Sequence, residues 1–433
     1  MPTSIANGET GISCRGKLNH MLGMVNNVKD FGAVGDGSTD DTAAIQAAID
    51  DAYGAAASPH GITTPYNNKA VYFPNGKYKV VPSIQRTITN AVNNAGKIQL
   101  TLSGLGTSGM NVKQAINVSG VVGTTEANNT WFYTIDSGTQ ITLLNSTFTH
   151  AYTSGGTLAN AALNFYAVQG AKVFGGGRFA TTIFSNVTSG MTISCNGVGY
   201  SSFSDMEIQG SPSGVAFDLN WDNVAVQSTQ SNSFRDMFFD GVSNAGFVGL
   251  QIGAGGFQCS ENLIENCFFS GLTIAGLSVR NFNALAQTVI GGDFQSCAIG
   301  IWVNSGSAPV IHGTAFQGQT DTDIAVDNQA GDCYSISGCR TESTNFCRFG
   351  NGPSANIGAC IQAAATSGTF VQMSGGAGGS SGAPGGVTID SCWSKNGKIT
   401  GNGSLYIRGN PSAAAFGNAS YLTSFTGTVV QNI

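Results

Sequence analysis

The 433 residues carry little charge: 10% are Asp, Glu, Lys or Arg, whereas 61 are glycine. A net charge of −6 with 18 Lys and Arg excludes a basic stripe for nucleic acid, and this composition favours strands and turns over long helices. No run of 18 apolar residues predicts a transmembrane helix, so membrane insertion is not expected.

Residues 1–27 have neither a basic start nor an apolar run, so no secretion by a signal peptide is expected and the ten cysteines are predicted to be reduced and mostly buried. The run "GETGISCRGKLNHMLGMV" resembles the leader of phage tail-fibre and tailspike proteins. This resemblance implies a virion protein that assembles in the host cytoplasm and attaches through the leader to other phage tail or baseplate proteins. Such proteins are usually homotrimers.

Residues 28–87 begin with "VKDFGAVGDGSTDDTAAIQAAIDDA". Ser38 and Asp41 have the spacing of a capping box before a helix. The apolar face of that helix, residues 44, 45, 48 and 49, is expected to cover the open first coil of the fold. Together with "AVYFPNGKYKV", the stretch resembles the start of the pectate-lyase-like β-helix superfamily, which many phage tailspikes share. The resemblance resumes over residues 167–185 and concerns the fold, not the chemistry.

Residues 88–157 form an insertion with alternating strands and glycine-rich turns. The run "VSGVVGTTEANNTW" within it is similar to a small β-barrel-like module of phage tail proteins. The insertion is interpreted as a satellite domain that is either structural or in contact with carbohydrate. Trp131 is predicted to belong to its core.

Residues 158–433 repeat a short apolar pattern every 22–31 residues, with Gly or Asn at the corners. Such a period is typical of a solenoid of β coils. Leucine-rich repeats share the period, but their pattern of leucines is missing from this sequence. The sequence therefore predicts an all-β, right-handed parallel β-helix with one N-terminal capping helix and the inserted domain. The residues expected to fill its core are Ile264, Cys267, Phe269, Ile290, Phe294, Ile311 and Phe316.

The cysteines that recur in the coils, such as Cys267, Cys339 and Cys392, are predicted to form an internal stack. Tight C-x-x-C pairs are missing from the sequence, so neither a metal site nor a cofactor is expected. Asp236 and Asn266 fall in a corner column, where their side chains are expected to bond the backbone.

Catalytic motifs of the superfamily are missing as well, including the polygalacturonase set and the calcium-dependent pectate lyase pattern, so candidates come from geometry. Side chains alternate in and out along a strand, and neighbouring coils lie roughly 4.8 Å apart. Outward residues on successive coils should therefore gather. The predicted catalytic residues are Glu265, Asp293 and Asp240, and the predicted substrate-binding residues are Arg235, His312, Arg340, Glu342 and Trp302.

Two carboxylates about 5–10 Å apart are what glycoside hydrolysis needs. Glu265 with Asp293 or Asp240 would supply them, and the cations would bind an acidic sugar. A lyase would use the same groups to neutralise a uronate and remove a proton. The alternative is a solvated, salt-bridged face without chemistry, and Trp302 would equally suit stacking on a sugar or packing between subunits.

The function expected from these features is that of a phage tailspike-like homotrimer that recognises and depolymerises a bacterial surface polysaccharide: capsule, exopolysaccharide or lipopolysaccharide O-chain. The alternative is a non-enzymatic receptor-binding or structural spike of the same fold. A cellular polysaccharide hydrolase or lyase is a third class, which the leader disfavours.

Overall fold

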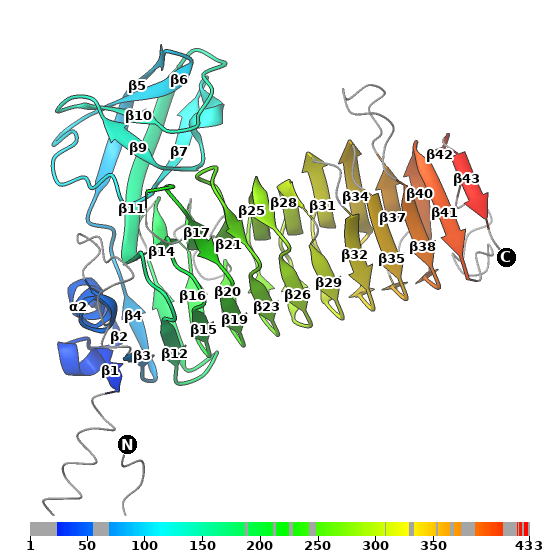
Figure 1. The fold of residues 1–433 in the computed structure, drawn as a ribbon, viewed down its shortest axis with the longest axis horizontal. Coiled ribbons are helices and arrows are strands. Elements are labelled where there is room, and N and C mark those ends of the chain that lie inside the picture. Colours follow the sequence, from blue (N-terminus) through cyan, green and yellow to red (C-terminus); the bar gives the residue numbers. More distant parts are fainter. Residues whose placement is uncertain are drawn as a thin grey trace, which may run out of the picture.

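Three parallel β-sheets run along the length of the molecule, and successive coils of the chain add strands to them (Figure 1). The computed structural model describes residues 24–431 except 55–68, 186, 188, 211–213, 225–227, 242–247, 308, 329–332, 352–353, 364–367, 374–385, 410–421, 423 and 427. Strands from successive coils pair in parallel, as Phe234 pairs with Ile264 and Ile264 with Val289. The predicted all-β, right-handed parallel β-helix is confirmed.

The first sheet contains β1 (Val25–Asn27), β3 (Ala70–Phe73), β12 (Lys172–Gly175), β15 (Ser202–Ser204), β19 (Ser233–Arg235), β23 (Leu263–Glu265), β26 (Thr288–Ile290), β29 (Val310–His312), β32 (Cys333–Ser337), β35 (Ser354–Gly358), β38 (Val387–Asp390), β41 (Ser404–Arg408) and β43 (Thr428–Gln431). The second contains β2 (Asp36–Asp40), β4 (Gly76–Lys79), β13 (Thr181–Phe184), β16 (Glu207–Gln209), β20 (Phe238–Asp240), β24 (Phe268–Ser270), β27 (Asp293–Gln295), β30 (Ala315–Gln317), β33 (Arg340–Thr341), β36 (Ile361–Gln362) and β39 (Trp393–Ser394).

The third sheet contains β11 (Ser154–Tyr166), β14 (Met191–Asn196), β17 (Val215–Asn220), β21 (Val248–Ile252), β25 (Ala275–Leu285), β28 (Ile299–Ser307), β31 (Thr322–Asn328), β34 (Asn345–Asn351), β37 (Gly368–Met373), β40 (Gly397–Gly401) and β42 (Ser424–Phe425). A two-stranded ladder joins β18 (Thr229–Gln230) to β22 (Cys259–Ser260). The strand β1 lies at the end of the body that carries the helix, and β43 lies at the opposite end (Figure 1).

A left-handed residue turns the chain from the first sheet into the second. Asp236 and Asn266 have φ of 51° and 50°, a region that Asn, Asp and Gly tolerate better than other residues. The Asn266 amide donates to the Asp236 carboxylate on the preceding coil. The two residues occupy the corner as predicted, but their side chains bond one another across coils, where bonds to the backbone were predicted.

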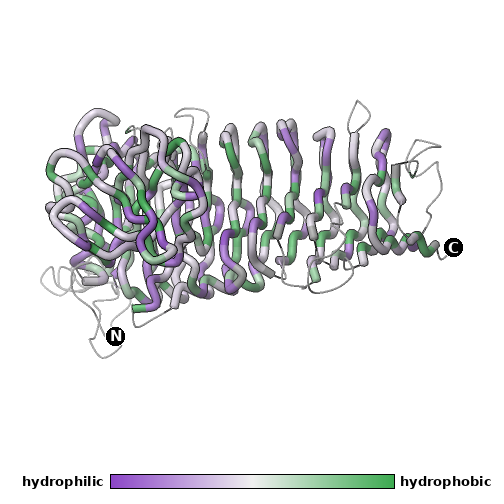
Figure 2. Tube along the Cα trace, turned by 90° about the horizontal axis from the view of Figure 1, so that it is seen from above, coloured by the Kyte–Doolittle hydropathy of each residue, from purple (hydrophilic) through white to green (hydrophobic). Residues whose placement is uncertain are grey.

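Hydrophobic residues recur along the coils (Figure 2), and a continuous cluster of buried apolar side chains fills the interior. Phe239, Phe269, Phe294 and Phe316 stack with ring centroids 4.7, 4.4 and 5.4 Å apart. The remaining predicted core residues are also buried, with one exception.

That exception is Ile290, which is 40% exposed. Its neighbour Val289 points inward and pairs with Ile264, so Ile290 lies opposite Glu265 in the outward row. The apolar pattern predicts Ile290 as the inward residue, one position out of register, and a shift of one residue exchanges the two faces of a strand.

Helix α2 (Thr42–Tyr53) follows the 3₁₀ turn η1 (Val28–Phe31) and covers the first coil, as predicted. Ile45, Ala48 and Ile49 are buried, and Ala44 packs on the same core. The hydroxyl of Tyr53 donates to the carbonyl oxygen of Lys172 on β12 at 2.9 Å, which ties the helix end to the first sheet.

The capping box predicted for Ser38 and Asp41 is wrong. Asp41 precedes the helix, but its carboxylate accepts from the backbone N–H groups of Val34 and Gly35 at 2.7 and 3.0 Å. Asp40 instead accepts from the first amide of the helix at 3.0 Å. Ser38 belongs to the extended strand β2, so the chain does not fold back as a capping box requires.

The inserted domain comprises β5 (Gln85–Asn94), β6 (Lys97–Leu102), β7 (Ile116–Val122), η2 (Thr125–Ala127), β8 (Thr130–Trp131), β9 (Tyr133–Ile135) and β10 (Gln140–Leu143). Its strands pair antiparallel and include the first half of β11, whose second half pairs in parallel with β14. The boundary predicted at 157 falls within β11. Trp131 is buried, as predicted, and donates to the carbonyl oxygen of Ala127 at 2.7 Å.

Nine cysteines are described, all as free thiols, and only Cys333 is exposed. Cys339, Cys360 and Cys392 stack on successive coils, where the Cys360 N–H donates to the Cys392 sulfur at 3.4 Å. The predicted leader, up to residue 23, lies outside the described residues, whereas β1 begins at Val25 and already pairs with β3.

Candidate functional site

The outer face of the second sheet carries a row of aligned side chains near the corner. Parallel register places Thr182, Glu207, Phe238, Phe268 and Asp293 beside one another on β13, β16, β20, β24 and β27. We call this row the outer row. Since adjacent strands lie roughly 4.8 Å apart, five strands span about 19 Å, the length of a short oligosaccharide.

Two carboxyl groups meet at one end of the outer row. The Gln209 amide nitrogen donates to Glu207 Oε1 at 2.7 Å and to Asp240 Oδ2 at 3.2 Å, so these two oxygens are at most about 6 Å apart. Both side chains are largely buried. Burial raises the pKa of Glu207, and the neighbouring Asp240 adds to this, against hydrogen bonds from Gln209 and Thr182. Glu207 therefore keeps its proton to higher pH than an ordinary glutamate.

Three phenylalanines follow the carboxyl pair. Phe238 and Phe268 pack at a centroid distance of 4.9 Å, and Phe179 meets Phe238 edge-on at 5.5 Å. Phe179 comes from the loop after β12 and is 69% exposed. We call these three rings the aromatic platform. Apolar ring faces of this kind suit the C–H face of a sugar.

A groove of about 370 Å³ lies at the other end of the platform, lined by Arg178, Phe179, Asn266, Phe268 and Asp293, among others. Arg178 extends from its loop to donate to the Asn266 carbonyl oxygen at 3.0 Å. Burial raises the pKa of Asp293, and the negative charge of Glu342 adds to it, against an N–H bond from Phe294. Asp293 Oδ1 is buried without a hydrogen-bond partner among the described residues.

The structure brings only some of the predicted residues together. Arg235 and Glu265 form an ion pair, Nε to Oε2 3.1 Å, on the outer face of the first sheet. His312 lies in the same row two strands further along, beyond Ile290, and shares a 2.9 Å hydrogen bond with Ser337. These residues stand before the corner, whereas Asp293 stands after it.

Arg340 and Glu342 form a second ion pair, 2.8 Å, on β33 and the residue after it, two strands beyond Asp293. Asp240 lies at the opposite end of the outer row, beside Glu207 and not beside Glu265.

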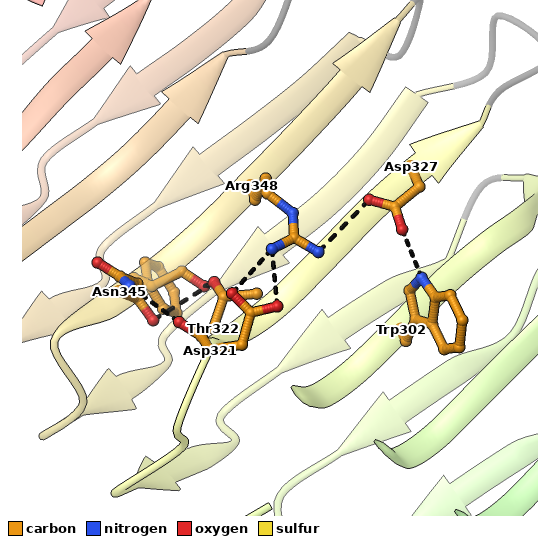
Figure 3. A network of polar contacts seen from close by, with 7 residues as sticks. Trp302, Asp321, Thr322, Asp327, Asn345 and Arg348 are labelled. Atoms are coloured by element: carbon orange, nitrogen blue, oxygen red, sulfur yellow. Dashed lines mark hydrogen bonds and ion pairs between the residues drawn. The ribbon is translucent and has the colours of Figure 1, made fainter. Parts of the chain in front are cut away.

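Trp302 is separate from all of them, because β28 belongs to the third sheet. It points outward, as predicted, and its Nε1 donates to Asp327 at 2.7 Å. Arg348 links Asp327 to Asp321, with N···O distances of 3.5 and 2.8 Å, so a single guanidinium bridges two carboxylates (Figure 3).

Sequence reasoning missed Glu207, Arg178 and Phe179. Glu207 shares the outer row with Asp293, but the repeat pattern does not reveal its burial beside Asp240. Arg178 and Phe179 belong to "GGGRF", which reads only as a glycine turn. Arg178 contacts Asn266 across 88 residues, and no local pattern encodes such a contact.

The described residues contain no group of three or more His, Cys, Asp or Glu arranged to hold a metal ion. No helix in the described part of the chain is long and apolar enough to cross a membrane. The site thus consists of carboxyl groups, aromatic rings and one arginine on a β-helix surface.

Fold and site together define a parallel β-helix protein with a carboxylate-bearing outer face. The family described as rhamnogalacturonase A/epimerase, pectate lyase-like, matches residues 25–324, more than half of the chain. The chain belongs to this family.

Curated relatives match a shorter region. Mannuronan C5-epimerase AlgE5 of Azotobacter vinelandii is 56% identical over 54 residues, 12% of this chain and 4% of that protein. Alginate lyase 7 of the same organism is 53% identical over 57 residues, 13% and 5% respectively. The chain thus spans a small fraction of the length of the relatives it matches.

Solved structures with a similar course of the chain include ORF18 of Geobacillus virus E2, at 12% identity and a TM-score of 0.46, covering 99% of this chain and 64% of that one. The A-module of mannuronan C-5 epimerase AlgE6 of Azotobacter vinelandii has 15% identity and a TM-score of 0.41, covering 94% and 99%. The tailspike gp61 of Pseudomonas phage phi297 has 14% identity and a TM-score of 0.27, covering 94% and 84%.

Proposed function

We propose that this protein is a phage tailspike that binds a bacterial surface polysaccharide along the outer row of the second sheet and cleaves it there. Membership of the pectate lyase-like family supports action on a polysaccharide. The tail-fibre-like leader supports a place in the virion. The observation that carries the proposal is the pair Glu207 and Asp240, joined through Gln209 and followed by the aromatic platform.

The Glu207 and Asp240 carboxyl oxygens joined by Gln209 are at most about 6 Å apart, closer than the roughly 6.5–9.5 Å typical of inverting enzymes, so we assign hydrolysis with retention. Glu207, whose pKa is raised, donates a proton to the glycosidic oxygen as the bond to the anomeric carbon breaks. Asp240 attacks that carbon and forms a glycosyl ester. Water then hydrolyses the ester and returns its proton to Glu207. The rate is expected to fall as the pH rises through the pKa of Glu207, because only the protonated form donates.

The remaining groups hold the chain of sugars. Phe179, Phe238 and Phe268 stack on sugar faces, and Arg178 and Asp293 contact hydroxyl or acidic groups in the groove. The catalytic role predicted for Glu265 remains a prediction, and its carboxylate is engaged by Arg235. The binding roles of Arg235, His312, Arg340 and Glu342 likewise stay proposals for a longer substrate that crosses the corner.

The test is to incubate the protein with alginate, polygalacturonate and a panel of bacterial capsular polysaccharides and O-chains, and to measure new reducing ends. We expect cleavage of at least one polymer by the wild type and none by the double variant E207Q/D240N, which should still bind it. Glu261→Gln is the matched control, because Glu261 is exposed at a different corner. Cleavage by the double variant at the wild-type rate would contradict the proposal.

A non-enzymatic receptor-binding spike is the second candidate. It is favoured by the two exposed ion pairs, Arg235–Glu265 and Arg340–Glu342, which neutralise four of the predicted site residues. This candidate predicts saturable binding of one polymer, with neither new reducing ends nor the ultraviolet absorbance of an unsaturated uronate. That absorbance without hydrolysis would instead identify a lyase.

Attachment through residues 1–27 to tail or baseplate proteins, and assembly as a homotrimer, are part of the same proposal. Light scattering after size exclusion should give three times the 44.3 kDa mass of one chain. A monomer at micromolar concentration would contradict the trimer.

A further inference from the structure

A second pocket lies where the inserted domain meets the third sheet. The insertion rests on that sheet through Thr130, which accepts from the Gln251 amide at 2.8 Å, and through Lys113, whose carbonyl oxygen accepts from Asn196 at 2.8 Å. Residues of the insertion and of the third sheet together line a cavity of about 170 Å³, among them Asn117, Ser119, Asn128, Gln251 and Arg280. We call it the inter-domain pocket. It does not overlap the outer row.

Arg280 supplies a cation to this pocket. Among the described residues no carboxylate forms an ion pair with its guanidinium. Burial lowers its pKa to about 10, so it stays charged at neutral pH. Arg280 is half-buried, and a partly desolvated cation without a carboxylate partner is costly, so an anion in the pocket would reduce that cost.

The position of Arg280 is fixed by stacking. Its guanidinium lies over the ring of Trp302 at 4.8 Å, and the indole is held by its hydrogen bond to Asp327. Figure 3 shows that Asp327 and Asp321 both pair with Arg348. These acids therefore already have a cation of their own, and the charge of Arg280 is left for the pocket.

Asn117 supplies an acceptor. Asn117 is buried, with 6% of its surface exposed, and its Oδ1 has no hydrogen-bond partner among the described residues. Nearby Asp218 is not an alternative partner for Arg280, because it accepts from Ser194, Asn220 and Gln251 at 3.0–3.4 Å. The pocket thus offers a donor for an anion and an acceptor for a hydroxyl.

We propose that the inter-domain pocket binds one acidic sugar unit, with its anionic group on Arg280 and a hydroxyl donating to Asn117. A guanidinium forms paired, charge-assisted hydrogen bonds with a carboxylate, which suits this role. The volume fits one monosaccharide and not a polymer segment. The pocket would hold a side branch or chain end while the outer row acts elsewhere, and it binds whether or not Glu207 and Asp240 cleave.

The test is calorimetric titration of the full chain with sodium glucuronate, glucose and sodium sulfate, each separately, at low salt. We expect glucuronate to bind one site per chain, and glucose and sulfate each to bind at least tenfold more weakly. Arg280→Gln should weaken glucuronate at least tenfold, and Asn117→Ala should weaken glucuronate but not sulfate. Arg408→Gln, at an exposed position on β41, is the control.

Equal binding of glucuronate to wild type and Arg280→Gln overturns the proposal, and so does equal affinity for sulfate and glucuronate, which marks a simple anion site. Trp302→Phe keeps the charge and the ring, so it should retain most affinity and provides a folded comparison. Because the readout is a monosaccharide affinity, loss of cleavage in E207Q/D240N leaves it unchanged, and the two proposals fail separately.

Discussion

The side-chain amide of Gln46 hydrogen-bonds both backbone groups of Asn164: its oxygen accepts from the Asn164 N–H at 2.9 Å, and its nitrogen donates to the Asn164 carbonyl at 3.0 Å. Asn164 lies on β11, the first strand of the third sheet. Its backbone groups on the side away from β14 face α2, where no further strand of the sheet pairs with them. A helix side chain thus occupies the place of a missing strand. An open sheet edge invites association with other chains, and this contact blocks it.

Replacing Gln46 with Ala should therefore lower the free energy of unfolding by about 1–3 kcal/mol and increase aggregation, because two backbone groups lose their partners. Urea unfolding and light scattering measure the two effects. Gln372→Ala, on an exposed position of β37, should change neither. Equal stability of both variants would show that the Gln46–Asn164 contact contributes nothing to the stability of the fold.

The phenylalanine stack should be the most sensitive part of the interior. Phe269 lies between Phe239 and Phe294, at centroid distances of 4.7 and 4.4 Å, and is fully buried. Phe269→Ala is expected to lower the free energy of unfolding by about 3–5 kcal/mol, because the substitution leaves a cavity that the neighbouring coils cannot close. Phe179→Ala, at an exposed ring, should cost less than about 1 kcal/mol. Similar midpoints in denaturant for the two variants would contradict this picture.

Asp323 should make stability fall with rising pH. It points into the core, where burial raises its pKa from 3.8 to about 8 against the weaker opposing effect of the Thr341 and Ser343 side chains. The folded chain then holds a proton that the unfolded chain has lost, so stability is greatest below pH 4 and is lost progressively up to about pH 8.

Asp323→Asn removes that titration. The variant should be more stable than the wild type at pH 8, by up to several kcal/mol, and less dependent on pH between 4 and 8. Thermal unfolding over this range is the measurement. An unchanged pH dependence would mean that Asp323 titrates normally in the folded chain.

The aromatic platform should contribute to binding without chemistry. Phe179→Ala removes an exposed ring that meets Phe238, and should weaken the affinity for a bound polysaccharide by about 1 kcal/mol, roughly fivefold. The turnover of bound substrate should change little. Surface plasmon resonance on the immobilised polymer measures the affinity, and a loss confined to turnover would argue against a stacking role.

Much of the fold could be predicted because each coil repeats one local rule. Phe239, Phe269 and Phe294 recur at one inward position, and Asp236 and Asn266 mark the corner, so period and topology follow from sequence alone. Ile290 was misplaced because "TVIGG" offers two apolar residues in succession, and only pairing with Ile264 selects Val289.

The site was less predictable. Alternation along a strand predicts which side chains point outward, but it does not predict how buried they are. Asp240 and Glu207 point outward and are still largely buried. The sequence predicts that Glu265 and Asp293 act together, but Glu265 lies on the first sheet and Asp293 on the second, on opposite sides of the corner that Asn266 marks. Arg178 reaches the groove from a distant loop, a contact that depends on the assembled coils.

The most direct test is the initial rate of release of reducing ends from a cleaved polysaccharide, compared between E207Q and E265Q. The account predicts that the initial rate of E207Q is lower than that of the wild type by about 10²–10⁴-fold, the usual contribution of a general acid. The rate of E265Q should stay within about tenfold of the wild-type rate. Full activity of E207Q together with inactivity of E265Q would contradict it and place the chemistry on the first sheet.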